Sequence, residues 1–98
     1  MDERATDKEF IKWAADVKHR DNYVCQICKV RGSKLTSHHL NSWDSFPEDR
    51  YNLENGTTLC VKHHEFFHQT YGFGNNTKYQ FEEFLQILEK INKIARIK

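Results

Sequence analysis

Residues 55–72, NGTTLCVKHHEFFHQTYG, contain the pattern that decides the fold. The dipeptide Asn55-Gly56 is typical of a turn, and residues 57–60, which follow it, suit a short strand. Residues 61–71 then suit a helix, because a glycine stands where that helix should end. The stretch therefore predicts a turn, a strand and a helix in direct succession.

The residues before this stretch predict a partner for that strand. Residues 35–40, LTSHHL, suit a second short strand, and residues 41–52 form a polar loop that contains Pro47, the only proline. A strand or loop over residues 21–28, which ends in a metal knuckle, precedes them. The central unit, residues 21–71, is therefore predicted to be a ββα arrangement.

A helix is expected on each side of the central unit. Residues 7–19 have apolar side chains at helical spacing, and Thr6 with Glu9 reads as a capping box. Residues 77–97 show the same periodicity, and Thr77 with Gln80 forms a second capping box. The apolar positions of the two helices, which we assign to the core, are Phe10, Ile11, Trp13, Ala14, Val17, Phe81, Phe84, Leu85, Leu88, Ile91 and Ala95. We expect the first helix to pack against the last one or against the central unit.

Length and composition indicate one small globular domain over residues 1–98, of the α+β class. Hydrophobic residues make up 38% of the chain and charged residues 30%, which is ordinary for a folded protein. A hydrophobic core of this size often gives only marginal stability, so a bound metal that stabilises the fold would be consistent with the chain length. The chain has no apolar run long enough for a membrane span, and its first ten residues, MDERATDKEF, are too polar for a secretory signal. We therefore expect a cytoplasmic protein.

Charge points weakly to nucleic acid. The net charge is only +1, but basic residues gather in two places that could meet phosphate. A solvated surface is the competing interpretation. The two groups are Lys18, Arg20, Lys29, Arg31 and Lys34, and Lys90, Lys93, Arg96 and Lys98.

Two short motifs predict a structural zinc site. Cys25-Gln-Ile-Cys28 and Cys60-Val-Lys-His63 each place two soft or borderline ligands one turn apart. Brought together they would complete a tetrahedron and join the two ends of the central unit. Buried free cysteines or a redox motif are the alternatives, and the second is disfavoured because no βαβ pattern surrounds Cys25.

The histidines predict a second metal site. Five lie between residues 38 and 68. His64 and His68 are four apart on the predicted helix, so they share one face and can grip one ion. His63 lies about 100° away around that helix, on the side of Cys60.

His38 and His39 should have different roles. Adjacent side chains on a strand point to opposite faces. One of them can complete a three-histidine site with His64 and His68, while the other points at a water molecule. Three protein ligands leave positions open for water and substrate, which is typical of a catalytic metal.

These motifs together resemble the HNH endonucleases, also called ββα-metal or His-Me finger nucleases. The His-His pair and the H-x3-H helix are similar to the colicin-type branch, and the zinc knuckles are similar to the phage-like branch. The likeness covers roughly residues 8 to 85. The resemblance implies that His39 is the general base, that His38, His64 and His68 hold the catalytic metal, and that Asn55 orients His39. Asn52 competes with Asn55, since Asn52-Leu53 also resembles the usual Asn-Leu pair. The chain departs from the family in having His63 where cysteine is commoner, and His38 where many relatives have aspartate.

The resemblance also implies an activity. We expect hydrolysis of double-stranded DNA to a 5′-phosphate and a 3′-hydroxyl, by nicking or with weak specificity. A divalent metal (Mg, Mn, Ni, Co or Zn) would act as Lewis acid, and Arg50 or Lys62 could steady the phosphate. A phage origin and a terminase partner are conceivable by family analogy only. The alternatives are a non-catalytic zinc module that binds DNA or protein, and a metal-dependent RNase.

Overall fold

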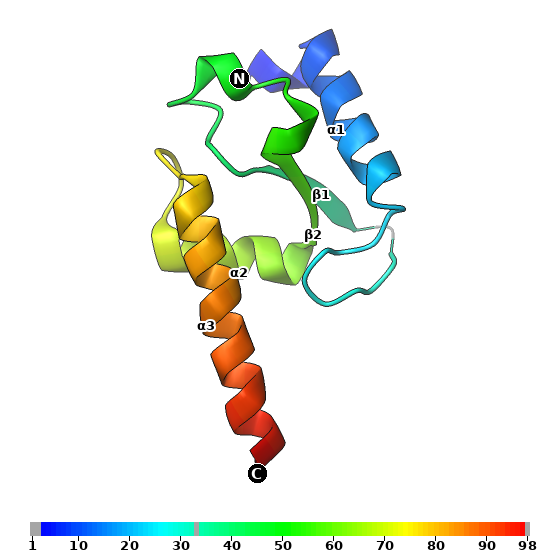
Figure 1. Cartoon of the computed structure of the whole chain (residues 1–98). Coiled ribbons are helices and arrows are strands. Elements are labelled where there is room, and N and C mark those ends of the chain that lie inside the picture. Colours follow the sequence, from blue (N-terminus) through cyan, green and yellow to red (C-terminus); the bar gives the residue numbers. More distant parts are fainter. Residues whose placement is uncertain (1–2, 33, 98) are drawn as a thin grey trace.

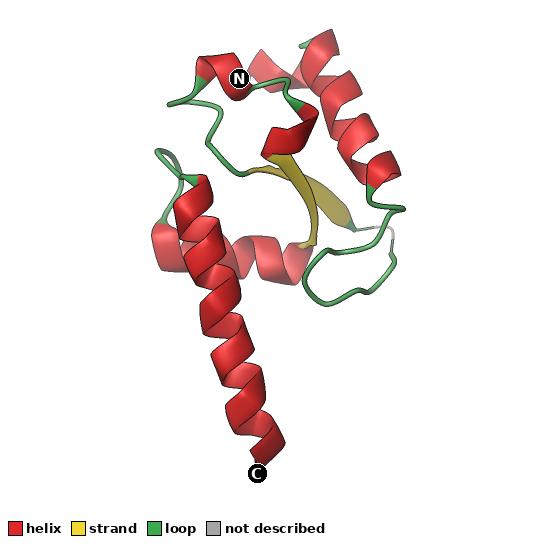
Figure 2. Cartoon of the chain, in the orientation of Figure 1, coloured by secondary structure: helices red, strands yellow, loops and turns green. Residues whose placement is uncertain are grey.

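The structure, a computed structural model, describes residues 3–32 and 34–97. These residues form a small α+β arrangement of three helices and a two-stranded antiparallel sheet, with three short 3-10 turns between them (Figures 1 and 2). The elements, in chain order, are α1 (Lys8–Arg20), β1 (Leu35–His39), β2 (Gly56–Cys60), α2 (Val61–Tyr71) and α3 (Lys78–Ile97). The order helix, strand, strand, helix, helix agrees with the sequence-based expectation.

The observed boundaries differ little from the predicted ones. Each of α1, β1, β2 and α3 begins or ends one residue away from its predicted limit, and α2 has the predicted bounds. The predicted capping box of α1 is wrong, because Asp7 rather than Thr6 caps this helix and accepts a hydrogen bond from the Phe10 backbone N–H at 3.1 Å. The Asp7 carboxylate also accepts a hydrogen bond from the Tyr51 hydroxyl at 2.6 Å, which connects α1 to the segment between β1 and β2. The capping box of α3 is confirmed, since Thr77 and Gln80 bond each other's backbone N–H groups at 3.2 Å.

The register of the sheet places the histidine pair. Leu35 pairs with Cys60 at one end, and His39 pairs with Gly56 at the other. Helix α2 follows β2 directly and contacts β1, and the His38 ring centroid lies 5.4 and 5.6 Å from those of His64 and His68. His38 is thereby brought to α2, on the sheet face opposite α1.

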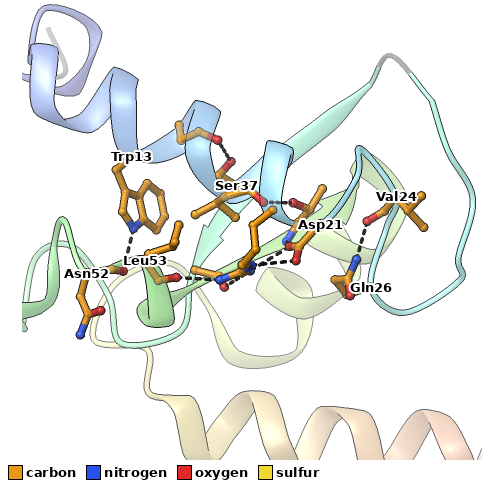
Figure 3. Close-up of polar contacts among 12 residues, drawn as sticks. Trp13, Asp21, Val24, Gln26, Ser37, Asn52 and Leu53 are labelled. Carbon is orange, nitrogen blue, oxygen red and sulfur yellow. Dashed lines mark hydrogen bonds and ion pairs between the residues drawn. The ribbon is translucent and has the colours of Figure 1, made fainter.

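Helix α1 packs on one face of the sheet rather than against α3. Trp13 and Val17 are its buried side chains. The Trp13 indole N–H donates to the Asn52 carbonyl at 2.8 Å, and the Asp21 carboxylate accepts from the Thr58 backbone N–H at 3.0 Å (Figure 3). These bonds join the middle of α1 and its C-terminal end to the segment that contains β2.

Helix α1 packs closely on the sheet at Gly56. A Cβ atom at this position would lie 2.5 Å from Val17 Cγ2 and 2.7 Å from Trp13 Cζ2. Both neighbours are buried, so neither can move aside freely. Only glycine leaves room for the helix at this distance.

We therefore predict that Gly56→Ala destabilises the fold by about 1–3 kcal/mol through overpacking. Thermal melting measures the effect. Gly32→Ala is the matched control, because a Cβ atom there would meet no atom of the described residues within 4 Å. Equal melting temperatures for the two variants would contradict the close packing of α1 on Gly56.

The hydrophobic core lies on the other face of the sheet. Phe67 of α2 is fully buried there, between β2 and the first turns of α3. The buried members of this core are Cys25, Leu59, Phe67, Phe81 and Phe84. The C-terminal part of α3 extends away from the rest of the chain (Figure 1). The assignment to the core is therefore wrong for Ile91 and Ala95, which are exposed, and it is also wrong for the exposed Ile11 and Leu85. Among the described residues, no helix has the length and apolar character needed to cross a membrane.

Candidate metal centres and the adjoining pocket

The structure brings the two knuckle motifs together. One ligand atom from each of Cys25, Cys28, Cys60 and His63 lies within 4.8 Å of all the others. The Cys28 and Cys60 sulfurs are 3.9 Å apart, and Cys60 Sγ is 3.3 Å from His63 Nδ1. Sulfur and nitrogen ligands at about 2.3 and 2.1 Å from a tetrahedral zinc ion would lie about 3.4–3.8 Å apart. These four residues, named the cysteine cluster below, could hold a zinc ion.

The backbone around Cys25 and Cys28 forms a tight turn that brings the two thiols to the same site. Lys29 adopts a left-handed φ of 62° and its N–H bonds the Cys25 carbonyl at 2.9 Å, closing the turn around the first knuckle. Burial alone would raise the pKa of the Cys25 thiol. Hydrogen bonds from the backbone of Cys28, Cys60 and Ile27 outweigh burial, so the pKa lies below its usual value. A thiolate is the form that binds metal.

The second group of ligands comes from β1 and α2. One ring nitrogen from each of His38, His64 and His68 lies within 4.8 Å of the other two. We call these residues the histidine cluster. His64 Nε2 and His68 Nε2 are 3.1 Å apart. Two nitrogens held about 2.1 Å from one ion would lie about 3.0–3.4 Å apart, so the spacing fits a shared metal.

The lowered pKa values in the histidine cluster keep the imidazoles of His38 and His64 neutral, which is the form that binds a metal. Burial, followed by the charges of His64 and His68, lowers the pKa of His38 to about 3. Burial and then His68 lower the pKa of His64 to about 4. His38 Nε2 is buried without a hydrogen-bond partner among the described residues. A buried, unpaired imidazole nitrogen is costly, and a metal ion bound to its lone pair would remove that cost, as a hydrogen-bond donor would.

His68 has the outer hydrogen bond that metal ligands usually have. Its Nδ1 is 2.9 Å from the Gly72 carbonyl, which can only accept, so the proton is on Nδ1. Nε2 is then the free lone pair, and it faces His64. Such a bond to the backbone orients a ligand ring and selects its tautomer.

His39 points to the opposite face of the sheet, as the strand spacing predicts. Its ring stacks on Trp13 with centroids 3.8 Å apart and an interplanar angle of 10°. His39 Nε2 lies 2.9 Å from the Arg50 carbonyl, so this nitrogen donates and Nδ1 has the free lone pair. Burial lowers the pKa of His39, although the bond to Arg50 opposes this shift, so the imidazole is neutral at pH 7. A neutral imidazole with a free nitrogen can accept a proton from water.

Asn55 holds the loop that positions His39. Its Oδ1 accepts from the Asn41 N–H at 2.9 Å, and its Nδ2 donates to the carbonyls of Asn41 and Asp49 at 2.9 and 3.1 Å. Asp49 precedes Arg50, whose carbonyl binds His39. The competing Asn52 is exposed and caps a short 3-10 turn through Glu54. Asn55 is therefore the asparagine that supports the histidine pair.

A pocket of about 390 Å³ joins these features, although His38 and His39 point to different sides of the sheet. Its lining includes His38, His39, His64 and His68 together with Arg4, Ser42, Trp43, Asp44 and Phe73. His39 and the histidine cluster therefore border one space. A small substrate group could contact both.

None of the described basic residues that the sequence suggested as phosphate contacts lines the pocket. Arg50 donates its Nε to the Trp43 carbonyl and places its guanidinium 4.4 Å from the Trp43 ring. Lys62 is exposed on α2. Arg20, from the first basic group, donates to the carbonyls of Leu53 and Gly56, so it supports the fold. Lys29, Arg31 and Lys34 remain exposed, and Lys98 lies outside the described residues.

Sequence reasoning missed the residues that surround the pocket. Arg4 lines it, and its guanidinium lies 5.6 Å from the Trp43 ring. Trp13 was assigned to the core, but it also forms the surface on which His39 stacks. Phe73 stacks on His68 with centroids 4.3 Å apart. These residues are distant in sequence from the motifs, so no local pattern could have identified them.

The two adjacent histidines of α2 are expected to respond differently to mutation. His63→Ala should release metal from the cysteine cluster and lower the melting temperature, because a zinc ion bound there would lose one of its four ligands and with it folding free energy. His64→Ala should weaken only the histidine cluster and leave the melt nearly unchanged. Metal stoichiometry and thermal melting of the two variants, measured in parallel, check this. Loss of the structural zinc in His64→Ala but not in His63→Ala would reverse the assignment.

Comparisons of the chain with protein-family models, with curated proteins and with solved structures found no match.

Proposed function

We propose that this protein is a metal-dependent DNA endonuclease with a ββα-metal core of the HNH type. The observation that carries the proposal is the meeting of two different groups at one pocket. The histidine cluster supplies a three-ligand metal site, and His39 supplies a neutral base whose proton-accepting nitrogen is free. A zinc module that only binds needs the cysteine cluster alone, so it leaves the histidine cluster and His39 without a role.

The metal ion of the histidine cluster would supply Lewis-acid stabilisation of charge on the phosphate and on the leaving 3′ oxygen. His38, His64 and His68 would hold this ion from one side, which leaves coordination positions for water and substrate. Three imidazole ligands favour Zn, Ni, Co or Mn over Mg by ligand type, although the resemblance implies that Mg or Mn can also work.

His39 would act as the general base. Its Nδ1 would accept a proton from the attacking water, while Nε2–H keeps donating its hydrogen bond to the Arg50 carbonyl, which would stabilise the imidazolium that forms. Stacking on Trp13 keeps the ring in one orientation throughout. Asn55 contributes indirectly, because it holds the loop that contains the Arg50 carbonyl.

Arg4 is the best-placed basic group for the phosphate. It borders the pocket, and its charge adds to the effect of burial in lowering the pKa of His39. A guanidinium recognises two phosphate oxygens at once. Arg4 therefore replaces Arg50 and Lys62 as the residue expected to steady the substrate.

A cleavage assay on two substrates tests the proposed function. The purified protein is incubated with supercoiled plasmid or with structured RNA, in Mg, Mn, Ni or Zn and in EDTA. We expect metal-dependent conversion of the plasmid to the nicked form and little change in the RNA. Binding of DNA without cleavage in any metal would indicate the zinc-module alternative. Faster cleavage of RNA would indicate an RNase.

A further inference from the structure

The loop between α2 and α3 presents an aromatic ring at the edge of the pocket. Phe73 borders the pocket and is 84% exposed. Single exposed apolar side chains are common, so exposure alone has no meaning. The position of this one is informative, since its ring lies parallel to the imidazole of His68, at an interplanar angle of 8°.

The backbone on both sides of Phe73 is held in place. Gly72 and Gly74 adopt φ angles of 79° and 88°, which glycine tolerates and other residues rarely adopt. The Asn75 N–H donates to the Asp44 carboxylate at 3.2 Å, and the Asn76 carbonyl accepts from the Ser42 N–H at 3.0 Å. The loop is therefore fixed to the segment that contains Ser42 and Asp44, while the Phe73 ring stacks on His68 and leaves most of its surface exposed.

A second aromatic group borders the pocket beside His39. Trp43 packs edge-on against the His39 ring, with centroids 5.8 Å apart. The guanidinium groups of Arg4 and Arg50 lie 5.6 and 4.4 Å from the Trp43 ring. Phe73 thus lies beside the histidine cluster, and Trp43 lies beside His39. The guanidinium groups of Arg4 and Arg50 lie next to Trp43. Aromatic rings interleaved with basic groups are typical of surfaces on which unpaired nucleic-acid bases stack.

We propose that Phe73 stacks on a DNA base that has left the helical stack beside the cleaved phosphate. This inference rests on the proposed function and adds a substrate preference to it. In a regular duplex both faces of each base are covered by its neighbours, so an apolar ring reaches a base only by partly unstacking it. Unstacking costs least at a mismatch and at flexible pyrimidine–purine steps. DNA that is mispaired or easily unstacked at the pocket is therefore the preferred substrate.

Cleavage of two matched oligonucleotide duplexes tests the preference. They share one sequence and differ by a single mismatch, and kcat/KM is measured for cleavage beside that position. We expect the wild type to cleave the mismatched duplex faster. Phe73→Ala should lose about 5- to 160-fold in kcat/KM on the paired duplex, the range that corresponds to the loss of one base–aromatic stack. Phe73→Trp should retain the activity.

Tyr79→Ala is the matched control, because Tyr79 is also an exposed aromatic residue, at 70%, but is outside the pocket lining. Metal content is measured for each variant, since Phe73 also touches a ligand of the histidine cluster. If added metal restores the rate of Phe73→Ala, the ring serves only to support His68 and the inference is overturned. Equal cleavage by Phe73→Ala and the wild type overturns it as well.

A fluorescence measurement keeps the inference testable apart from cleavage. In a duplex with 2-aminopurine beside the phosphate that is cleaved, the fluorescence of this base increases when it unstacks. In a His39→Ala background, we expect binding to raise the emission with Phe73 present and to leave it unchanged with Phe73→Ala. If the wild type cleaves no DNA, the proposed function fails and the fluorescence decides the inference alone: emission that does not depend on Phe73 overturns it.

Discussion

Replacing Cys25 by serine is expected to release one zinc ion per chain and to unfold much of the protein. Cys25 is fully buried and belongs both to the cysteine cluster and to the hydrophobic core. Structural zinc contributes about 10–16 kcal/mol in small zinc-binding peptides, whereas a whole domain is stable by about 5–15 kcal/mol. The zinc contribution is thus as large as the total stability, so its loss leaves little net stability.

Zinc content and thermal melting measure this effect, and Cys60→Ser should behave like Cys25→Ser. His63→Cys is the informative control, because a thiolate is an equally good fourth ligand and the variant should keep both zinc and fold. A serine variant that retains full zinc content and melts like the wild type would rule out the structural site.

His38→Ala is expected to remove the metal of the histidine cluster while the structural zinc stays bound. His38 is 3% exposed and its Nε2 has no other partner among the described residues, so the remaining histidines would form a two-ligand site. We predict a fall in metal stoichiometry by one ion per chain and at least a hundredfold loss of nicking, partly restored by excess metal.

His19→Ala serves as the control for His38→Ala, because His19 is exposed on α1 and belongs to neither cluster. If His38→Ala retains both metals while His39→Ala loses one, the roles of the two histidines are exchanged.

Local patterns in the sequence predicted the elements of the central unit well. Residues 55–72 combine a turn dipeptide, a short strand and a helix with a glycine after it, and each signal depends on neighbours only a few residues away. The division of His63 and His64 between two clusters also follows from helical spacing alone. The structure places them in that way, with His63 beside Cys60 and His64 beside His68.

The pocket could not be predicted in this way. Arg4, Trp43 and Phe73 come from three separate segments, and tertiary packing alone brings them to the histidines. The cap of α1 was misjudged for a similar reason. Thr6 and Asp7 are both suitable caps, and Asp7 also accepts the hydroxyl of the distant Tyr51, a contact that no local pattern indicates.

The rate of plasmid nicking by His39→Ala, compared with that of the wild type in the same saturating metal, tests the central claim most directly. Metal stoichiometry is measured on the same samples, so a loss of base is separated from a loss of metal. We predict that the variant binds as much metal as the wild type and nicks at least about a hundredfold more slowly, as the loss of a general base requires. An equal rate at equal metal content would contradict the assignment of His39 and of the pocket as the site of DNA hydrolysis.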